Sequence, residues 1–169
     1  HMNTMLDELL QLSRLEHGKQ RVDRVAVDPA SALYSAWKSC HPLHKNIEFV
    51  NELGASTPAV RANFEQLVQV FRNILENAVK YGISQLIEPG HIAIRADRLD
   101  DQLTIIVEDS AGLYKPLPKN DGMGLGLVDR RIKIRYGEAF GISISCEPER
   151  WTRVAISLPV EEEREAVTC

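Results

Sequence analysis

Two asparagines and a lysine near the middle of the chain have the types and spacing to bind a metal–phosphate group. On a helix, Asn73, Asn77 and Lys80 fall within about 60° of one another on one face. An amide oxygen can ligate Mg²⁺, and a lysine can contact a phosphate. Because asparagine is a poor helix former at an exposed interior position, two of them one turn apart indicate a binding role. Taken alone, the motif is equally compatible with a solvated polar helix face.

A carboxylate at the end of an apolar stretch is the second candidate. Ile105, Ile106 and Val107 lead to Asp109, and small residues follow as far as Gly112. A carboxylate in this place can accept a hydrogen bond from an exocyclic amine, such as that of adenine. Taken alone, the pattern is more typical of a strand-terminal Asp that caps its own loop.

Three glycines on alternate residues, Gly122, Gly124 and Gly126, are the third candidate. They free several backbone N–H groups where a helix begins, and the helix dipole adds to them, so that a polyphosphate can bind there. Two other glycine motifs are excluded, because Leu127 occupies the last glycine position of G-x-G-x-x-G and no Gly-Lys-Ser/Thr follows. A mobile hinge is the alternative interpretation.

Helices and strands that alternate along the chain must position these groups. Asn63 can cap a helix over residues 64–81, and Asp28-Pro29 begins another that we expect to run to about Lys45. A third helix should run from about Leu125 to Tyr136. The side of the 64–81 helix opposite the asparagines carries the expected core positions Phe64, Leu67, Phe71, Ile74 and Ala78. Strands are expected over residues 47–50, 91–98, 102–109, 141–147 and 152–158, with a loop over 110–121.

The last four of these strands come as two hairpins, one of them closed by Leu99-Asp100-Asp101. A parallel, doubly wound sheet would not have this order. We therefore predict an α/β fold, a two-layer α/β sandwich with one mixed sheet and helices on one face.

Composition limits the class of protein. The chain has 169 residues, 44% of them hydrophobic, which predicts about one globular domain with a core of useful size. Its net charge of −4 argues against a nucleic-acid-binding module. No apolar run is long enough to span a membrane. Three scattered cysteines (Cys40, Cys146 and Cys169) are typical of free thiols in a reducing cytoplasm.

The first residues follow a different pattern from the rest. Met2, Met5, Leu9 and Leu12 form a coiled-coil-like seam on a helix over residues 2–17, and such a helix needs a partner. His1-Met2 looks like a cleaved tag joined to a start codon. We therefore expect a tag scar and helix end over residues 1–18, one domain over 19–160, and an acidic tail over 161–169.

The three candidates in this order resemble the catalytic, ATP-binding domain of bacterial sensor histidine kinases, in the GHKL superfamily that includes gyrase and MutL ATPases. Residues 73–82 resemble the N box, 109–112 the first glycine box and 122–126 the second. Residues 2–17 are similar to the end of the second helix of the dimerisation and phosphoacceptor hairpin. Residues 124–159 look closer to the LytS type of kinase. The implied fold is the Bergerat ATP-binding fold.

The resemblance implies a role for each position. Asn77 would ligate the Mg²⁺ that bridges the ATP phosphates, with Asn73 assisting; Lys80 would contact phosphate, Tyr81 would border the nucleotide, and Asp109 would bind the adenine amine. Gly112, Gly122, Gly124 and Gly126 would shape the lid and give N–H groups to phosphate, with Leu127 in the same site. Residues 113–121 would be the ATP lid.

The implied activity is phosphoryl transfer from Mg-ATP to a histidine that this chain lacks, because none of its five histidines precedes an acidic residue. We expect no autophosphorylation of the chain alone and little ATP hydrolysis, since Asn73 stands where the superfamily's hydrolases have a glutamate base. The implied partners are the chain's own dimerisation and phosphoacceptor domain and a response regulator. The longer protein would be homodimeric, with this domain in the cytoplasm and a membrane anchor left open.

A degenerate module that binds partner proteins without catalysis is the alternative. Ala111 and Leu113 stand at two glycine positions of the family's first glycine box, and only Gly112 between them is kept.

Overall fold

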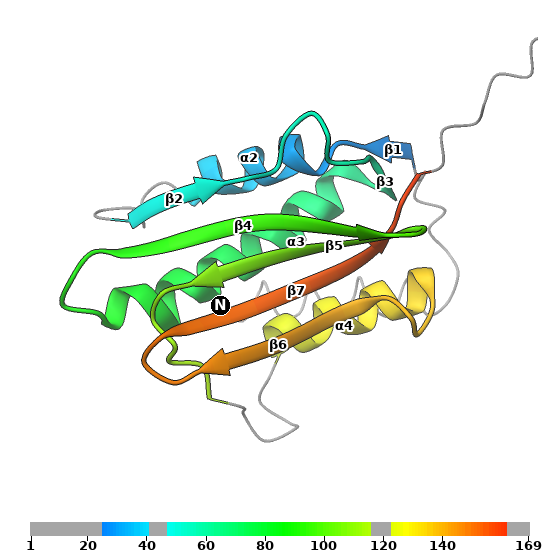
Figure 1. Cartoon of the computed structure of the whole chain (residues 1–169). Helices are drawn as coiled ribbons and strands as arrows, with labels where there is room; N and C mark the ends of the chain where they lie inside the picture. The colour runs from blue at the N-terminus through cyan, green and yellow to red at the C-terminus, as the bar shows by residue number, and fades with distance from the viewer. Residues whose placement is uncertain (1–24, 41–46, 116–122, 162–169) are drawn as a thin grey trace, which may run out of the picture.

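A computed structural model describes residues 25–40, 47–115 and 123–161. Its main element is a five-stranded sheet with the order β2-β4-β5-β7-β6 (Figure 1). β2 pairs with β4 in parallel, and the other neighbours are antiparallel, so the sheet is mixed. The strands are β2 (Ile47–Asn51), β4 (Gly90–Leu99), β5 (Gln102–Asp109), β6 (Gly141–Glu147) and β7 (Trp151–Pro159).

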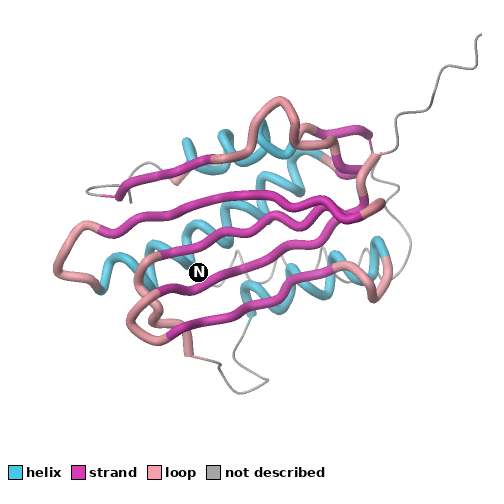
Figure 2. The backbone as a smooth tube through the Cα atoms, viewed as in Figure 1, coloured by secondary structure: helices cyan, strands magenta, loops and turns pink. Residues whose placement is uncertain are grey.

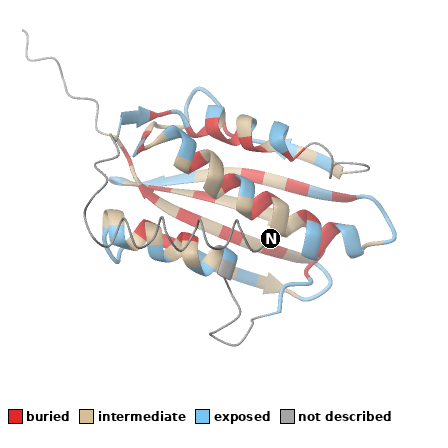
Figure 3. Cartoon of the chain, turned by 180° about the vertical axis from the view of Figure 1, so that it is seen from behind, coloured by how far each residue is buried: buried red, intermediate tan, exposed pale blue. Residues whose placement is uncertain are grey.

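Three helices cover one face of this sheet: α2 (Pro29–Ser39), α3 (Phe64–Asn77) and α4 (Met123–Tyr136). Figure 2 shows them behind the strands, and Figure 3 shows the same layer from its own side. The arrangement confirms the predicted two-layer α/β sandwich. The opposite sheet face carries charged groups, including an ion-paired cluster of Arg95, Glu108 and Arg153.

Alternation along the central strands produces the two faces. In β5 and β7 every second residue is buried, as expected for strands with one covered face. The buried positions point toward the helices and form one core with residues of α2 and α3. The largest fully buried side chains include Leu33, Phe71, Ile74, Leu75, Ile92, Ile94, Leu103, Ile105 and Ile156.

Both predicted hairpins are present. β4 and β5 are joined by Asp100-Asp101, with Leu99 paired to Gln102, and Asp100 has a φ of 53°. Asp tolerates this left-handed conformation in tight turns. β6 and β7 form the second hairpin.

A second, two-stranded sheet was not predicted. β1 (Val25–Val27) pairs with β3 (Val60–Ala62), and Val60 also bridges to Val160 beyond β7. Each of these strands has three residues, which is too short for a period of two to be visible in the sequence.

Several predicted boundaries were wrong. α2 ends at Ser39 with Cys40 as its C-cap, well before Lys45; Pro42 lies two residues further on and disfavours helix before it. The α-helical part of the 64–81 helix ends at Asn77 and continues as a π-helix, η2 (Ala78–Gly82), and a 3₁₀ turn, η3 (Ile83–Gln85). α4 begins at Met123, two residues earlier than expected.

One predicted core residue was also wrong. Phe64 is 41% exposed, because it is the first residue of α3 and has no preceding helical turn to pack over, whereas Leu67, Phe71 and Ile74 on the same side are buried.

Some expectations fall outside the described residues: the helix over 2–17, the tail beyond 161, most of the lid, and Gly122. Within the part that the structure does describe, no helix is both long and apolar enough to cross a membrane.

Candidate functional site

The C-terminal half of α3 and the start of α4 enclose an open pocket of about 140 Å³. Four of the predicted site residues on α3 and η2 line it, together with one predicted glycine of α4. The lining residues are Asn73, Glu76, Asn77, Lys80, Tyr81 and Gly124. The structure therefore brings the N-box motif and the second glycine motif together in this pocket, although about fifty residues separate them in the sequence.

Lys80 and Tyr81 lie in the π-helical turn that follows α3 directly. Lys80 Nζ lies 4.9 Å from the centroid of the Tyr81 ring, within the range of a cation–π contact. Tyr81 is 61% exposed, so its ring forms an outer wall of the pocket. Single π-helical turns within helices occur frequently at functional sites, and this one supplies two of the residues that line the pocket.

The first turn of α4 approaches Asn77 closely. A β-carbon at Gly124 would lie 3.6 Å from Asn77 Nδ2, whereas one at Gly126 would meet nothing within 4 Å. Leu127 is partly buried and does not line the pocket. Of the described residues in this motif, Gly124 is therefore the one that faces the asparagine.

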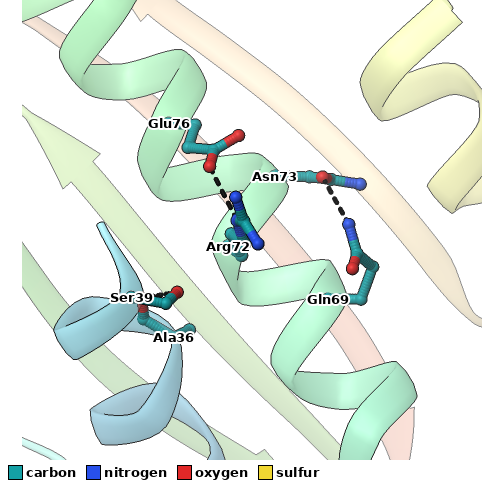
Figure 4. A network of polar contacts seen from close by, with 6 residues as sticks. All are labelled: Ala36, Ser39, Gln69, Arg72, Asn73 and Glu76. Atoms are coloured by element: carbon teal, nitrogen blue, oxygen red, sulfur yellow. Dashed lines mark hydrogen bonds and ion pairs between the residues drawn. The ribbon is translucent and has the colours of Figure 1, made fainter. Parts of the chain in front are cut away.

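On the polar face of α3, side chains one turn apart are joined by hydrogen bonds (Figure 4). Gln69 Nε2 donates to Asn73 Oδ1 at 3.2 Å, which leaves that oxygen a second lone pair. Arg72 Nε donates to Glu76 Oε1 at 2.7 Å. Both pairs follow the i, i+4 spacing that brings helix side chains together. Glu76 thus lines the pocket as an ion-paired carboxylate.

Asp109 does not line the pocket, but it lies beside Gly82 at the end of η2, the turn that supplies Lys80 and Tyr81. The side chain is 5% exposed, and its Oδ1 accepts a hydrogen bond from the Ala111 N–H at 2.9 Å. A β-carbon at Gly82 would lie only 3.2 Å from the same oxygen. Burial raises the pKa of Asp109, and hydrogen bonds from the N–H groups of Ala111 and Gly112 offset part of that rise. Asp109 therefore both caps its loop and borders the end of η2.

Gly112 contacts the β6–β7 turn and not the pocket. Its φ is +60°, and its carbonyl accepts the Glu149 N–H at 3.1 Å. A β-carbon there would come within 2.5 Å of both Arg150 N and Glu147 O. The first glycine motif thus fixes where the chain leaves β5.

Two residues that position the site were missed by the sequence reasoning. Gly82 permits the close approach of Asp109. In the sequence, only its place at the end of the Asn/Lys motif pointed to a role for this glycine. Asp129 joins α4 to β6, because its Oδ1 accepts the Ile142 N–H at 2.8 Å and its Oδ2 accepts from Lys133 at 2.7 Å. The hydrogen bond that Lys133 donates to the Asp129 carboxylate raises the pKa of Lys133. No spacing rule links a helix carboxylate to a strand thirteen residues later.

The donor set fits some metals and not others. Among residues 25–40, 47–115 and 123–161, no group of three or more His, Cys, Asp and Glu could hold a metal ion. The pocket offers the amide oxygens of Asn73 and Asn77 instead. Mg²⁺ suits such a site, because it keeps several waters and binds chiefly through the phosphates of a ligand.

The fold and the pocket define a class: an α/β domain with two asparagines and a lysine on one helical face and a buried carboxylate beside the end of that helical segment. Residues 62–162 match the family of histidine kinase-, DNA gyrase B- and HSP90-like ATPases. The chain belongs to this family, and its described part is an ATP-binding domain of the histidine kinase type.

Curated relatives include the sensor histidine kinase BtsS of Escherichia coli, 46% identical over 90 residues. That match covers 53% of this chain and 16% of the E. coli protein. The sensor histidine kinase YesM of Bacillus subtilis is 33% identical over 94 residues, with the same two shares. The chain therefore spans a small part of the length of these relatives.

Solved structures share the fold. The histidine kinase AdeS of Acinetobacter baumannii has a TM-score of 0.70 at 18% identity, covering 93% of this chain and 77% of that one. Full-length ShkA in complex with AMPPNP has a TM-score of 0.72 at 19% identity, covering 96% of this chain and 36% of that one. These likenesses confirm the predicted fold class.

Proposed function

We propose that the domain binds Mg-ATP in the pocket beside α3 and presents the γ-phosphoryl group to a histidine on another part of the protein. The observation that carries the proposal is the convergence of Asn73, Asn77, Lys80 and Gly124 on one pocket, with the buried Asp109 beside Gly82 at the end of η2. A cationic side chain, amide oxygens and a helix N-terminus suit a polyphosphate. A buried carboxylate suits an exocyclic amine.

Each predicted residue has a task in this proposal. Asn77, assisted by Asn73, would hold Mg²⁺ through its amide oxygen, and Lys80 would contact a phosphate. Tyr81 would border the nucleotide, and Asp109 would accept a hydrogen bond from the adenine amine. Gly124 and its neighbours Gly122, Gly126 and Leu127 would bring backbone N–H groups near the phosphates. Gly112 would support the base of the lid through the β6–β7 turn.

The chemistry would be transfer to a nitrogen nucleophile rather than hydrolysis. The bond between the γ-phosphorus and its bridging oxygen breaks as a phosphorus–nitrogen bond to histidine forms, and ADP leaves. Mg²⁺ would supply neutralisation of phosphate charge. The chain's own residues would orient the phosphates. Among the described residues that line the pocket, Asn73 cannot accept a proton, and the Glu76 carboxylate is ion-paired with Arg72, which disfavours its use as a base for water.

The altered glycine box is compatible with this role. Ala111, which stands at a glycine position, is 1% exposed. A β-carbon at Gly82 would meet the Ala111 methyl at 3.4 Å, an ordinary contact. The methyl therefore fills space beside Asp109 and does not obstruct the pocket.

The partners follow from the relatives. Their names make them sensor histidine kinases, and one solved structure, ThkA, is in complex with the response regulator TrrA. We propose a response regulator as a partner of the longer protein, together with its own dimerisation and phosphoacceptor domain, of which residues 2–17 would be the end. Homodimerisation and a cytoplasmic location of this domain belong to the same proposal.

A thermal-shift titration tests the binding function. With Mg²⁺ and a non-hydrolysable ATP analogue, the melting temperature should rise with ligand concentration, as mass action requires. Asp109→Asn should reduce the rise by removing the charged acceptor. No rise at millimolar analogue would instead favour a degenerate, non-catalytic interaction module.

A further inference from the structure

Two side chains beyond the N box converge on one backbone oxygen. Ser84 Oγ donates to the Lys80 carbonyl at 2.8 Å, and Gln85 Nε2 donates to the same oxygen at 3.2 Å. The two side chains also meet each other, with Gln85 Nε2 lying 3.2 Å from Ser84 Oγ. The direction of these bonds is not ambiguous, because a carbonyl oxygen can only accept.

The oxygen that they hold belongs to a residue of the pocket. Lys80 lies in the π-helix η2, and its side chain lines the pocket beside Tyr81. A π-helical turn is rare and usually short, so it depends on local contacts to persist. Relaxation to α-helical geometry would shift the side-chain directions of Lys80 and Tyr81 relative to Asn77 by part of a turn.

We infer that Ser84 and Gln85 are positioning residues, which fix the π-helical turn and so aim Lys80 at the nucleotide phosphates. The inference rests on the proposed function, because it assigns these two residues through the phosphate contact of Lys80. Neither residue touches the nucleotide in this scheme. Their effect therefore depends on the presence of both phosphate and the lysine ammonium group.

The double variant Ser84→Ala/Gln85→Met removes both donors and keeps the size of the glutamine side chain. We expect its Mg–ATP-analogue Kd to rise about three- to tenfold, the range for losing a hydrogen-bonded arrangement. The affinity for adenosine, measured by NMR titration, should not change, because Asp109 and Gly82 are untouched. Ser84→Thr keeps a hydroxyl donor and should bind both ligands like the wild type.

A double-mutant cycle with Lys80→Ala separates positioning from general damage. If the pair acts through Lys80, adding Ser84→Ala/Gln85→Met to Lys80→Ala should weaken Mg–ATP-analogue binding no further. Ser143→Ala, at an exposed position of strand β6, is the matched serine control and should bind like the wild type.

Three results would overturn the inference alone: unchanged affinity for the Mg–ATP analogue in the double variant, equal losses for the analogue and adenosine, or effects that add to that of Lys80→Ala. A wild-type chain that binds no analogue would overturn both this inference and the proposed function.

Discussion

Gly82 lies directly against the carboxylate of Asp109, at a distance that would place a β-carbon 3.2 Å from Asp109 Oδ1. The end of the N-box motif and the end of β5 are therefore in direct contact. Because that contact is tighter than ordinary van der Waals contact, the residue at 82 decides whether the carboxylate can keep its place.

A larger side chain at Gly82 should disturb the nucleotide site more than the fold elsewhere. Gly82→Val would push Asp109 and Ala111 aside, and we expect the Kd for a Mg–ATP analogue to rise at least about tenfold, as loss of a charged hydrogen bond would cause. Calorimetric titration measures the change. Gly54→Val is the matched control, since a β-carbon there meets nothing within 4 Å. Equal affinities for the two variants would contradict the role given to Gly82.

Nucleotide binding should weaken with acidification at a higher pH than an ordinary aspartate would give. Burial raises the pKa of Asp109, and a protonated carboxyl no longer offers the charged acceptor. His91 and Glu108 also act on this carboxyl electrostatically, in opposite directions. Titrations of the analogue over a pH series should show the loss in the wild type and not in Asp109→Asn. Parallel pH profiles of the two proteins would exclude Asp109 as the titrating group.

The same pKa shift has a defined effect on stability. Because the folded-state pKa of Asp109 is raised above the unfolded value, its charge penalises the folded state at neutral pH. The penalty is fully present above the folded pKa and is lost as the pH falls through that value toward the unfolded pKa. We therefore expect the gain in unfolding free energy from Asp109→Asn, measured by urea denaturation, to shrink on acidification. A gain that is constant with pH would contradict this assignment.

Gly112→Ala should destabilise the domain by about 1–3 kcal/mol, the range for strained or overpacked substitutions. Its φ is +60°, and the added methyl would meet backbone atoms of the β6–β7 turn at 2.5 Å. In contrast, Gly126→Ala lies in a helix with open space around it and should stabilise the fold by about 0.5–1 kcal/mol. Urea unfolding measures the stability of both variants. The opposite order of stabilities would contradict the close packing of Gly112 against the β6–β7 turn.

Removal of the Asp129 carboxylate should loosen α4 from the sheet. Asp129→Ala leaves the partly buried Ile142 N–H without its acceptor, which costs about 1 kcal/mol, the usual contribution of one hydrogen bond. Asp129→Asn keeps an acceptor oxygen and should lose less. Hydrogen exchange at Ile142 reports the contact directly. Unchanged protection of that amide in the alanine variant would show that the carboxylate is not what holds it.

Long, periodic elements were the part of the fold that could be predicted. The alternation of β5 and β7 and the apolar face of α3 carry enough residues for a period to be visible, and Asp28 and Asn63 mark helix starts by capping the first free N–H groups. β1 and β3 have no such signal, because their pairing depends on a partner far along the chain. The change from α- to π-helix at Ala78 has no periodic signal either, because the side-chain hydrogen bonds to the Lys80 carbonyl are not visible in a hydrophobic pattern.

The candidate site was predictable in membership more than in geometry. Asn73, Asn77 and Lys80 were found because one helix face already brings them together, whereas Tyr81 was named only through the family resemblance. Which glycine would face them was not predictable, since it depends on how α4 crosses α3. The contact of Gly112 with the β6–β7 turn could not be predicted either, because it joins segments that are distant in the sequence.

The pairing of β1 with β3, and of Val60 with Val160, fastens the first and last described strands to the same short segment. That segment lies at the Gln102 end of β5, and Asp109 marks the opposite end. The two ends of the described domain, at Val25 and Val160, therefore lie at the end of the sheet away from Asp109. A unit built in this way can be transferred between proteins during evolution, or fused to a reporter in the laboratory, without rebuilding the pocket.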